Sequence, residues 1–312
     1  MGTSRFVYAA AASAALAVLS LPLRAEADAA RAWAAAKDNL PASASMVIGV
    51  DVTAITKSTL FGQLMPLALS QQADVRKGLD LVKASCKIDP FAAIHGLVVA
   101  RDPDTGQGAV YVSLGGGLDQ PKLMKCLEEI AKASGVKDAK LAVKKTGAIT
   151  ELAMDKDKVY VSWIGSDVLV IPLDIRDKTQ LEKWSGQKGA LGRSPIGKLL
   201  ASVNTKGTVW GASSQAKQLD PGINMKGAYG ALSMAGGNLA IDLHVTMDSA
   251  KAATDAVAKA TAQIAQVSAG KAPPNVQAML KGVSVKAVGA EVAIKATVPE
   301  SELLGLMSMV GP

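Results

Sequence analysis

Aromatic residues are scarce in this sequence. Phe, Tyr and Trp together make up 4% of the 312 residues. Proteins that bind single-stranded nucleic acids or sugars by ring stacking need several exposed aromatic side chains. The shortage therefore argues against binding surfaces of that kind, and we expect no nucleic-acid partner.

Metal ligands and familiar catalytic motifs are also scarce. The chain has two histidines, His95 and His244, and two cysteines. A standard zinc site draws its ligands largely from these residue types, so we expect no metal site and no bound cofactor. The patterns G-x-S-x-G, H-E-x-x-H and G-x-G-x-x-G do not occur in the sequence. These patterns mark nucleophile elbows, zinc proteases and dinucleotide-binding turns.

One segment approaches a phosphate-binding motif. The stretch from Gly192 to Lys198 has the spacing of a P-loop, but Leu199 stands where Ser or Thr would reach magnesium. Pro195 also removes a backbone N–H from a loop that works by donating such groups. We therefore interpret Ser194 and Pro195 as the capped start of a helix.

The first 27 residues have the layout of a secretory signal peptide. A positive charge at Arg5 is followed by the uncharged run 6–23, and small residues at A-x-A spacing end at Ala27. The alternative is an uncleaved membrane anchor, because 18 apolar residues just reach spanning length. The run is mostly Ala and Ser and contains Pro22, so we favour cleavage. The mature chain is then periplasmic or extracellular, and we expect no transmembrane segment in it.

Export changes how the two cysteines are interpreted. Cys86 and Cys126 each lie on an apolar stripe of a predicted helix, so both thiols face a core. In an oxidising compartment, two core-facing cysteines predict one disulfide. The alternative is two separate buried thiols, since Cys often serves as a small apolar residue.

The order of strand and helix patterns predicts an α+β fold. The first half has strand patterns over 94–101 and 109–114, a helix from Asp119 to Gly135, and strand patterns over 141–154 and 159–173. A helical pattern over 53–86 precedes them, broken near Pro66 and at 70–73. Strands that follow one another as hairpins imply antiparallel sheets with helices packed on one face.

The second half repeats this order, with strand patterns over 228–234, 238–247, 283–288 and 291–298. Asp248 matches Asp119, and Gly270 matches Gly135. We therefore predict an internal duplication of a ββαββα-like unit. The predicted parts are a signal peptide at 1–27, a first α+β unit at 28–178, and a bridging helix with a second α+β unit at 179–312.

Asp242 and His244 are the candidate catalytic residues. With Thr246 they share one face of the strand pattern over 238–247, whose other face is apolar. A neighbouring Asp and His can act as an acid–base pair. The alternative is a solvated sheet face, which the alternation alone explains.

These features favour an exported, non-enzymatic protein. We expect it to bind a protein partner or an apolar small molecule between two duplicated α+β units. Two alternatives remain open: an envelope-associated hydrolase that uses His244 and Asp242, and a purely structural envelope component. The lack of a familiar catalytic motif favours the first interpretation.

The exported protein is expected to begin at Asp28, because the small residues before it suit signal peptidase. The intact mass of protein isolated from the envelope or the medium should equal that of residues 28–312. A full-length mass in the same fraction would contradict cleavage and support the membrane anchor.

Overall fold

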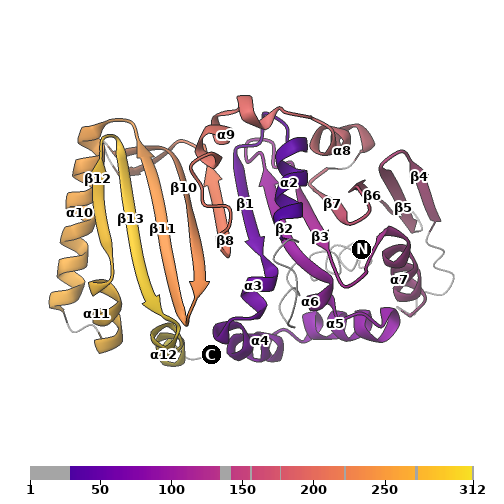
Figure 1. Ribbon diagram of the computed structural model, residues 1–312, viewed down its shortest axis with the longest axis horizontal. Helices are drawn as coiled ribbons and strands as arrows, with labels where there is room; N and C mark the ends of the chain where they lie inside the picture. The colour runs from indigo at the N-terminus through magenta and orange to yellow at the C-terminus, as the bar shows by residue number, and fades with distance from the viewer. Residues whose placement is uncertain are drawn as a thin grey trace. The chain divides into compact units, whose positions relative to one another are not determined.

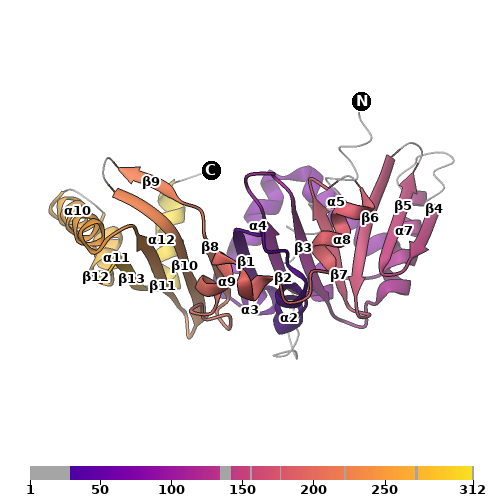
Figure 2. The ribbon, with the colours of Figure 1, turned by 90° about the horizontal axis from the view of Figure 1, so that it is seen from above.

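The computed structural model describes residues 29–133, 142–154, 157–175, 177–220, 223–270 and 273–310. The predicted signal peptide, its cleavage site and Gly135 lie outside these residues. The described chain has the predicted α+β class and folds as two compact units (Figures 1 and 2). Unit 1 contains the described residues up to Ala44 and Gly49–Leu191, and unit 2 contains Ser45–Ile48 and the described residues from Gly192 onward.

Strand β1 (Met46–Asp51) is divided between the units. Its first residues fold with unit 2, where the Ser214 amide donates to the Ser45 carbonyl at 2.9 Å. Gly211 lies so close to this strand that a Cβ on it would stand 2.8 Å from the Val47 carbonyl oxygen. The boundary predicted at 178/179 differs from this division in two ways. It does not place Ser45–Ile48 in the second unit, and it places residues 179–191 there, whereas they fold with unit 1.

Unit 1 is built on an antiparallel sheet with the strand order β2-β3-β7-β6-β5-β4. The strands are β2 (Ile94–Arg101), β3 (Gly108–Leu114), β4 (Ala142–Thr146), β5 (Ile149–Met154), β6 (Asp157–Ile164) and β7 (Val168–Leu173). The strands predicted over 141–154 and 159–173 are each a hairpin of two shorter strands. Gly147 and Gly165 make these turns with φ of 62° and 67°, which glycine adopts without strain.

Helices cover both faces of this sheet, which corrects the prediction of one covered face. All seven residues of β3 are buried, and neighbours along a strand point to opposite faces. On one face, the Tyr111 hydroxyl donates to the Trp184 carbonyl. On the other face, Val112 packs in a core with Val52 and Leu123. The helices of unit 1 are α2 (Ala29–Asn39), α3 (Val52–Thr56), α4 (Thr59–Gln71), α5 (Ala73–Cys86), α6 (Pro90–Ala93), α7 (Gln120–Ala133) and α8 (Lys178–Ser185).

The helical stretch before β2 breaks at one of the two predicted places. The chain leaves α4 at Gln72 and begins α5 at Ala73, within the predicted 70–73. Pro66 instead lies inside α4. Pro66 and Gly62 both lie on the exposed side of this helix, where the carbonyl that Pro66 leaves without a donor can face water.

The predicted disulfide is confirmed. Cys86, at the end of α5, is bonded to Cys126 of α7, and their Cα atoms are 4.8 Å apart. Cys126 is buried, as its apolar stripe predicts. The bond joins two helices of unit 1 and lies outside the site described below.

Unit 2 has an antiparallel sheet with the strand order β12-β13-β11-β10-β8, and β9 also pairs with β10. The strands are β8 (Val209–Ser213), β9 (Lys217–Asp220), β10 (Ile223–Ala235), β11 (Asn238–Met247), β12 (Ser284–Val288) and β13 (Glu291–Pro299). The helices are α9 (Pro195–Leu200), α10 (Ala250–Ala269), α11 (Pro274–Lys281) and α12 (Glu300–Val310), and the 3₁₀ turn η1 (Leu191–Arg193) joins the two units.

The two faces of the unit 2 sheet differ. Ala253 of α10 packs with Met247 and Val292 on the apolar face. Short helix α9 precedes a loop that approaches the opposite, polar face. Ser194 caps α9 through its hydroxyl, which accepts from the Gly197 amide at 3.2 Å. The segment from Gly192 to Lys198 is therefore a capped helix start, as interpreted from the sequence.

The units share a pattern of strand connections. In unit 1 the hairpin β2-β3 is followed along the chain by α7. In the sheet, β7 lies beside β3, and β6 lies on the outer side of β7. In unit 2 the hairpin β10-β11 is followed by α10 and ends with β13 beside β11 and β12 outside it. Unit 1 has the further hairpin β4-β5. A common strand order can arise without a common origin, so the internal duplication stays a prediction.

Replacing Cys86 and Cys126 together by Ser should lower the free energy of unfolding by about 4 kcal/mol, because the bond closes a loop of about 40 residues in the unfolded chain. Chemical unfolding of the oxidised protein and the double variant measures the difference. Thiol labelling of the denatured, unreduced protein is the control, and two labelled cysteines would contradict the bond.

Candidate functional site

The candidate site lies on the polar face of three neighbouring strands of unit 2. Strand pairing sets Tyr229 of β10 opposite His244 of β11, and Asp242 opposite Lys295 of β13. The alternation along β11 brings Asp242 and His244 to the same face, as the sequence predicted. Tyr229 and Lys295 join them only through strand register.

His244 lies between two carboxylates. Its Nε2 is 3.0 Å from Asp242 Oδ1, and its Nδ1 is 2.6 Å from Glu291 Oε1. The ring is stacked on Tyr229, with centroids 4.8 Å apart and planes 5° from parallel. Its side chain is 22% exposed. The imidazole therefore connects side chains from all three strands.

Two further contacts close this polar cluster. The Tyr229 hydroxyl donates to Glu291 Oε2 at 2.8 Å, so both oxygens of Glu291 are engaged. Lys295 Nζ lies 3.3 Å from Asp242 Oδ2. We refer to Tyr229, Asp242, His244, Glu291 and Lys295 as the His244 cluster.

Sequence reasoning missed three members of the His244 cluster. Glu291 and Lys295 occupy alternate positions of the strand predicted over 291–298, so they share a face. Tyr229 lies in the strand predicted over 228–234. The missing information was that β13 lies beside β11, which the alternation within one strand does not specify.

Tyr229 has an altered acidity. Burial is the largest cause, followed by the hydrogen bond to Glu291 and its negative charge, and together they raise the pKa of Tyr229 to about 12. A hydrogen bond from Ser202 and the charge of Asp242 act more weakly, in opposite directions. Tyr229 therefore stays protonated at neutral pH and donates to Glu291.

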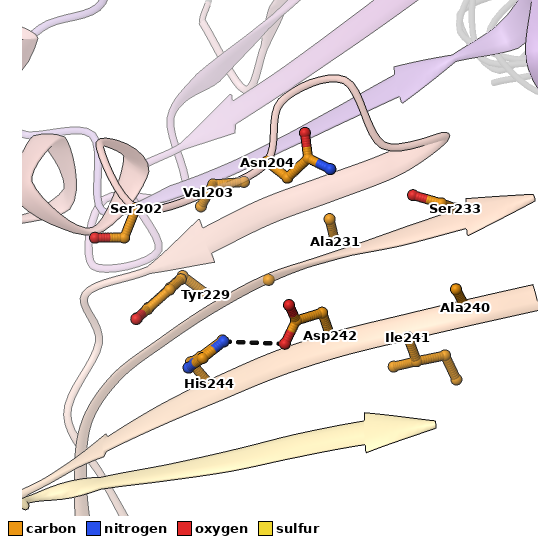
Figure 3. Close-up of a pocket in the computed structure, with 11 residues that line it drawn as sticks. Ser202, Val203, Asn204, Tyr229, Ala231, Ser233, Ala240, Ile241, Asp242 and His244 are labelled. Carbon is orange, nitrogen blue, oxygen red and sulfur yellow. Dashed lines mark hydrogen bonds and ion pairs between the residues drawn. The ribbon is translucent and has the colours of Figure 1, made fainter. Parts of the chain in front are cut away.

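A pocket of about 270 Å³ opens beside the His244 cluster (Figure 3). Its floor is formed by the strand pair β10-β11, and one wall by the loop that follows α9. The residues that line it are Ser202, Val203, Asn204, Tyr229, Gly230, Ala231, Ser233, Ala240, Ile241, Asp242 and His244. Small side chains on the floor leave the space open, and hydroxyl, amide and carboxylate groups surround it.

The ring nitrogens of His244 determine what chemistry this site can perform. In a catalytic acid–base pair, one nitrogen contacts a carboxylate and the other faces the reacting group. Here each nitrogen already contacts a carboxylate. A proton could be passed along the His244 cluster, but neither nitrogen is directed to a substrate in the pocket.

The same geometry bears on metal binding. A metal ion needs several ligand atoms directed at one point. In the His244 cluster the imidazole lies between the two carboxylates. Its nitrogens and the carboxylate oxygens therefore point at one another, and not at a common position where an ion could bind. Across the part of the chain that the structure describes, no three His, Cys, Asp or Glu side chains are placed to hold a metal ion. No helix in this part is long and apolar enough to span a bilayer.

Comparisons with known proteins give a distant structural similarity. No protein-family model and no curated protein matches the chain. A solved structure titled "Structure of crystal form III of TP0453" is similar with a TM-score of 0.46 and 11% identity, over 86% of this chain and 96% of the other. Crystal form IV of the same protein has a TM-score of 0.45 and 14% identity, over 88% and 98%. Similarity at this level carries no argument about the site.

The raised pKa of Tyr229 predicts a loss of stability in alkali. Between pH 10 and about 12 the unfolded chain would release the phenolic proton while the folded chain retains it. The free energy of unfolding should therefore fall over this range, and fall less in Tyr229→Phe. Urea unfolding at several pH values measures both slopes. Equal slopes in the two proteins would contradict the assignment.

Proposed function

We propose that the protein is an exported, non-enzymatic binding protein whose unit 2 pocket holds a small molecule. The observation that carries this proposal is the pocket of about 270 Å³ beside a histidine whose two ring nitrogens are both engaged by carboxylates. The pocket supports binding, and the engaged ring argues against catalysis by His244.

The lining of the pocket supports a ligand with polar groups. Ser202, Asn204 and Ser233 offer hydroxyl and amide groups, which can both donate and accept hydrogen bonds. Asp242 adds a carboxylate at the edge. Beneath them, Ala231 and Ala240 give a small apolar floor. A compact molecule with an apolar part and polar ends fits this mixed lining, whereas the sequence alone favoured a protein partner or an apolar small molecule.

Export is supported by the signal-peptide layout and by the disulfide between Cys86 and Cys126. Structural disulfides persist mainly in oxidising compartments such as the periplasm or the extracellular space. A protein of this kind would meet its ligand after export.

The hydrolase alternative rests on the contact between His244 and Asp242 at 3.0 Å. For His244 to act as a general base, its Nδ1 would have to leave Glu291 and face a substrate. This requirement makes the binding function the better supported of the two.

Native mass spectrometry of protein purified from its own envelope tests the proposal. A small mass should accompany the wild-type protein. It should be lost in Ser233→Leu, whose larger side chain would fill the pocket. Ser284→Leu is the matched control, because Ser284 is an exposed serine of the same sheet, on β12, outside the pocket.

The outcomes separate the parts of this proposal. A bare protein in all three preparations would overturn ligand binding. A mass retained by Ser233→Leu would place the ligand elsewhere and overturn the assignment of this pocket.

A further inference from the structure

The charges around the pocket indicate which class of ligand it takes. We infer that the ligand carries a protonated amine, that Asp242 is its counter-ion, and that His244 controls how strongly Asp242 attracts it. This inference rests on the proposed function and adds a ligand class and a means of regulation.

Asp242 has unused capacity to accept hydrogen bonds. Its two oxygens provide about four lone-pair positions, and the contacts with His244 and Lys295 use one position on each oxygen. The side chain is 50% exposed and lines the pocket. A positively charged group in the pocket can therefore reach this carboxylate without displacing either neighbour.

Among the residues that the structure describes, no other acidic side chain lines the pocket. The second carboxylate of the His244 cluster, Glu291, is not among the lining residues, and its oxygens contact His244 and Tyr229. Ser202, Asn204 and Ser233, which also line the pocket, are uncharged. An anionic ligand would be repelled by Asp242, and a neutral ligand would leave the remaining lone-pair positions of this half-exposed carboxylate to water. An ammonium group can occupy one of these positions with a charge-assisted hydrogen bond.

The sum of charges in the His244 cluster depends on the protons held by His244. Asp242 and Glu291 each carry a negative charge, Lys295 carries a positive charge, and Tyr229 is neutral. With two protons on the ring the charges cancel, and with one proton the cluster has a net charge of about −1. Lys286 of β12 is a further positive charge on this face, but it is exposed and lies outside the His244 cluster. Ala293 of β13 lies between it and His244, opposite both residues.

The contacts of the ring connect this charge to the pocket. Both ring nitrogens can donate to carboxylates only when the ring holds two protons. When one proton leaves, the nitrogen that held it presents a lone pair to its carboxylate, and that hydrogen bond is lost. Glu291 has the shorter contact, at 2.6 Å, and would keep the remaining proton. Asp242 would then lose the partner on Oδ1 and gain attraction for a cation in the pocket. Affinity for an amine is therefore expected to rise with pH, as His244 loses its second ring proton.

Three probes of equal length and different charge test the inference: butylammonium, butanol and butyrate. Each is titrated into the full mature protein, and nuclear magnetic resonance shifts of Tyr229 and His244 report binding. Butylammonium should bind best, and its affinity should rise about tenfold from pH 5 to 8, as expected for the loss of one partly screened neighbouring charge.

Variants separate charge from folding. Asp242→Asn keeps the shape of the side chain and should weaken butylammonium binding about tenfold while leaving butanol unaffected. Lys295→Gln removes the competing cation and should strengthen butylammonium binding. Lys286→Gln removes a positive charge outside the His244 cluster and is the matched control, with unchanged affinity. Thermal melting of each variant checks that it is folded.

The outcomes are distinct. Butanol binding as well as butylammonium, with no effect of Asp242→Asn, would overturn the amine and leave the proposed pocket standing. Amine binding that does not change with pH would overturn the control by His244. No binding by any probe, together with no co-purifying mass, would overturn the amine and the proposed function together.

Discussion

The position of His244 between two carboxylates depends on the register of three antiparallel strands. Each ring nitrogen needs its partner at hydrogen-bonding distance, and the partners lie on different strands. A shift of β13 by one residue would turn Glu291 and Lys295 to the apolar face, because side chains alternate along a strand. The apolar contacts of Met247 and Val292 with α10 on the opposite face oppose such a shift. The apolar core thus holds the polar site in place.

The sequence predicts which strands and helices the fold contains better than it predicts how they are layered. Alternating patterns locate most strands, and the stripes that contain Cys86 and Cys126 lead to the disulfide. The covering of both faces of the unit 1 sheet was missed, although β3 is an almost continuous apolar run, which is typical of a strand buried on both sides. The glycine turns at Gly147 and Gly165 were missed because a strand pattern continues on both sides of each glycine.

The site was half predicted for a similar reason. Asp242 and His244 are two residues apart, so their common face follows from local geometry alone. Glu291 is separated from His244 by 47 residues, and its place depends on which strand lies beside β11. That neighbour is set by the packing of α10 and by the path of the chain through α11 and β12. Periodicity within a segment carries no information about this choice. The same limit applies to the pocket, which depends on the loop after α9 and on small residues of two strands.

The division of β1 between the units has a consequence for the order in which the chain can fold. Ser45–Ile48 lies near the amino end, but its partners Gly211 and Ser214 are made more than a hundred residues later. Unit 2 is therefore not a separate segment of sequence, and cutting the chain at Leu191 would leave it without the residues beside β8. The early segment must therefore wait for the late one, and β1 cannot complete its pairing until the strands of unit 2 have been made.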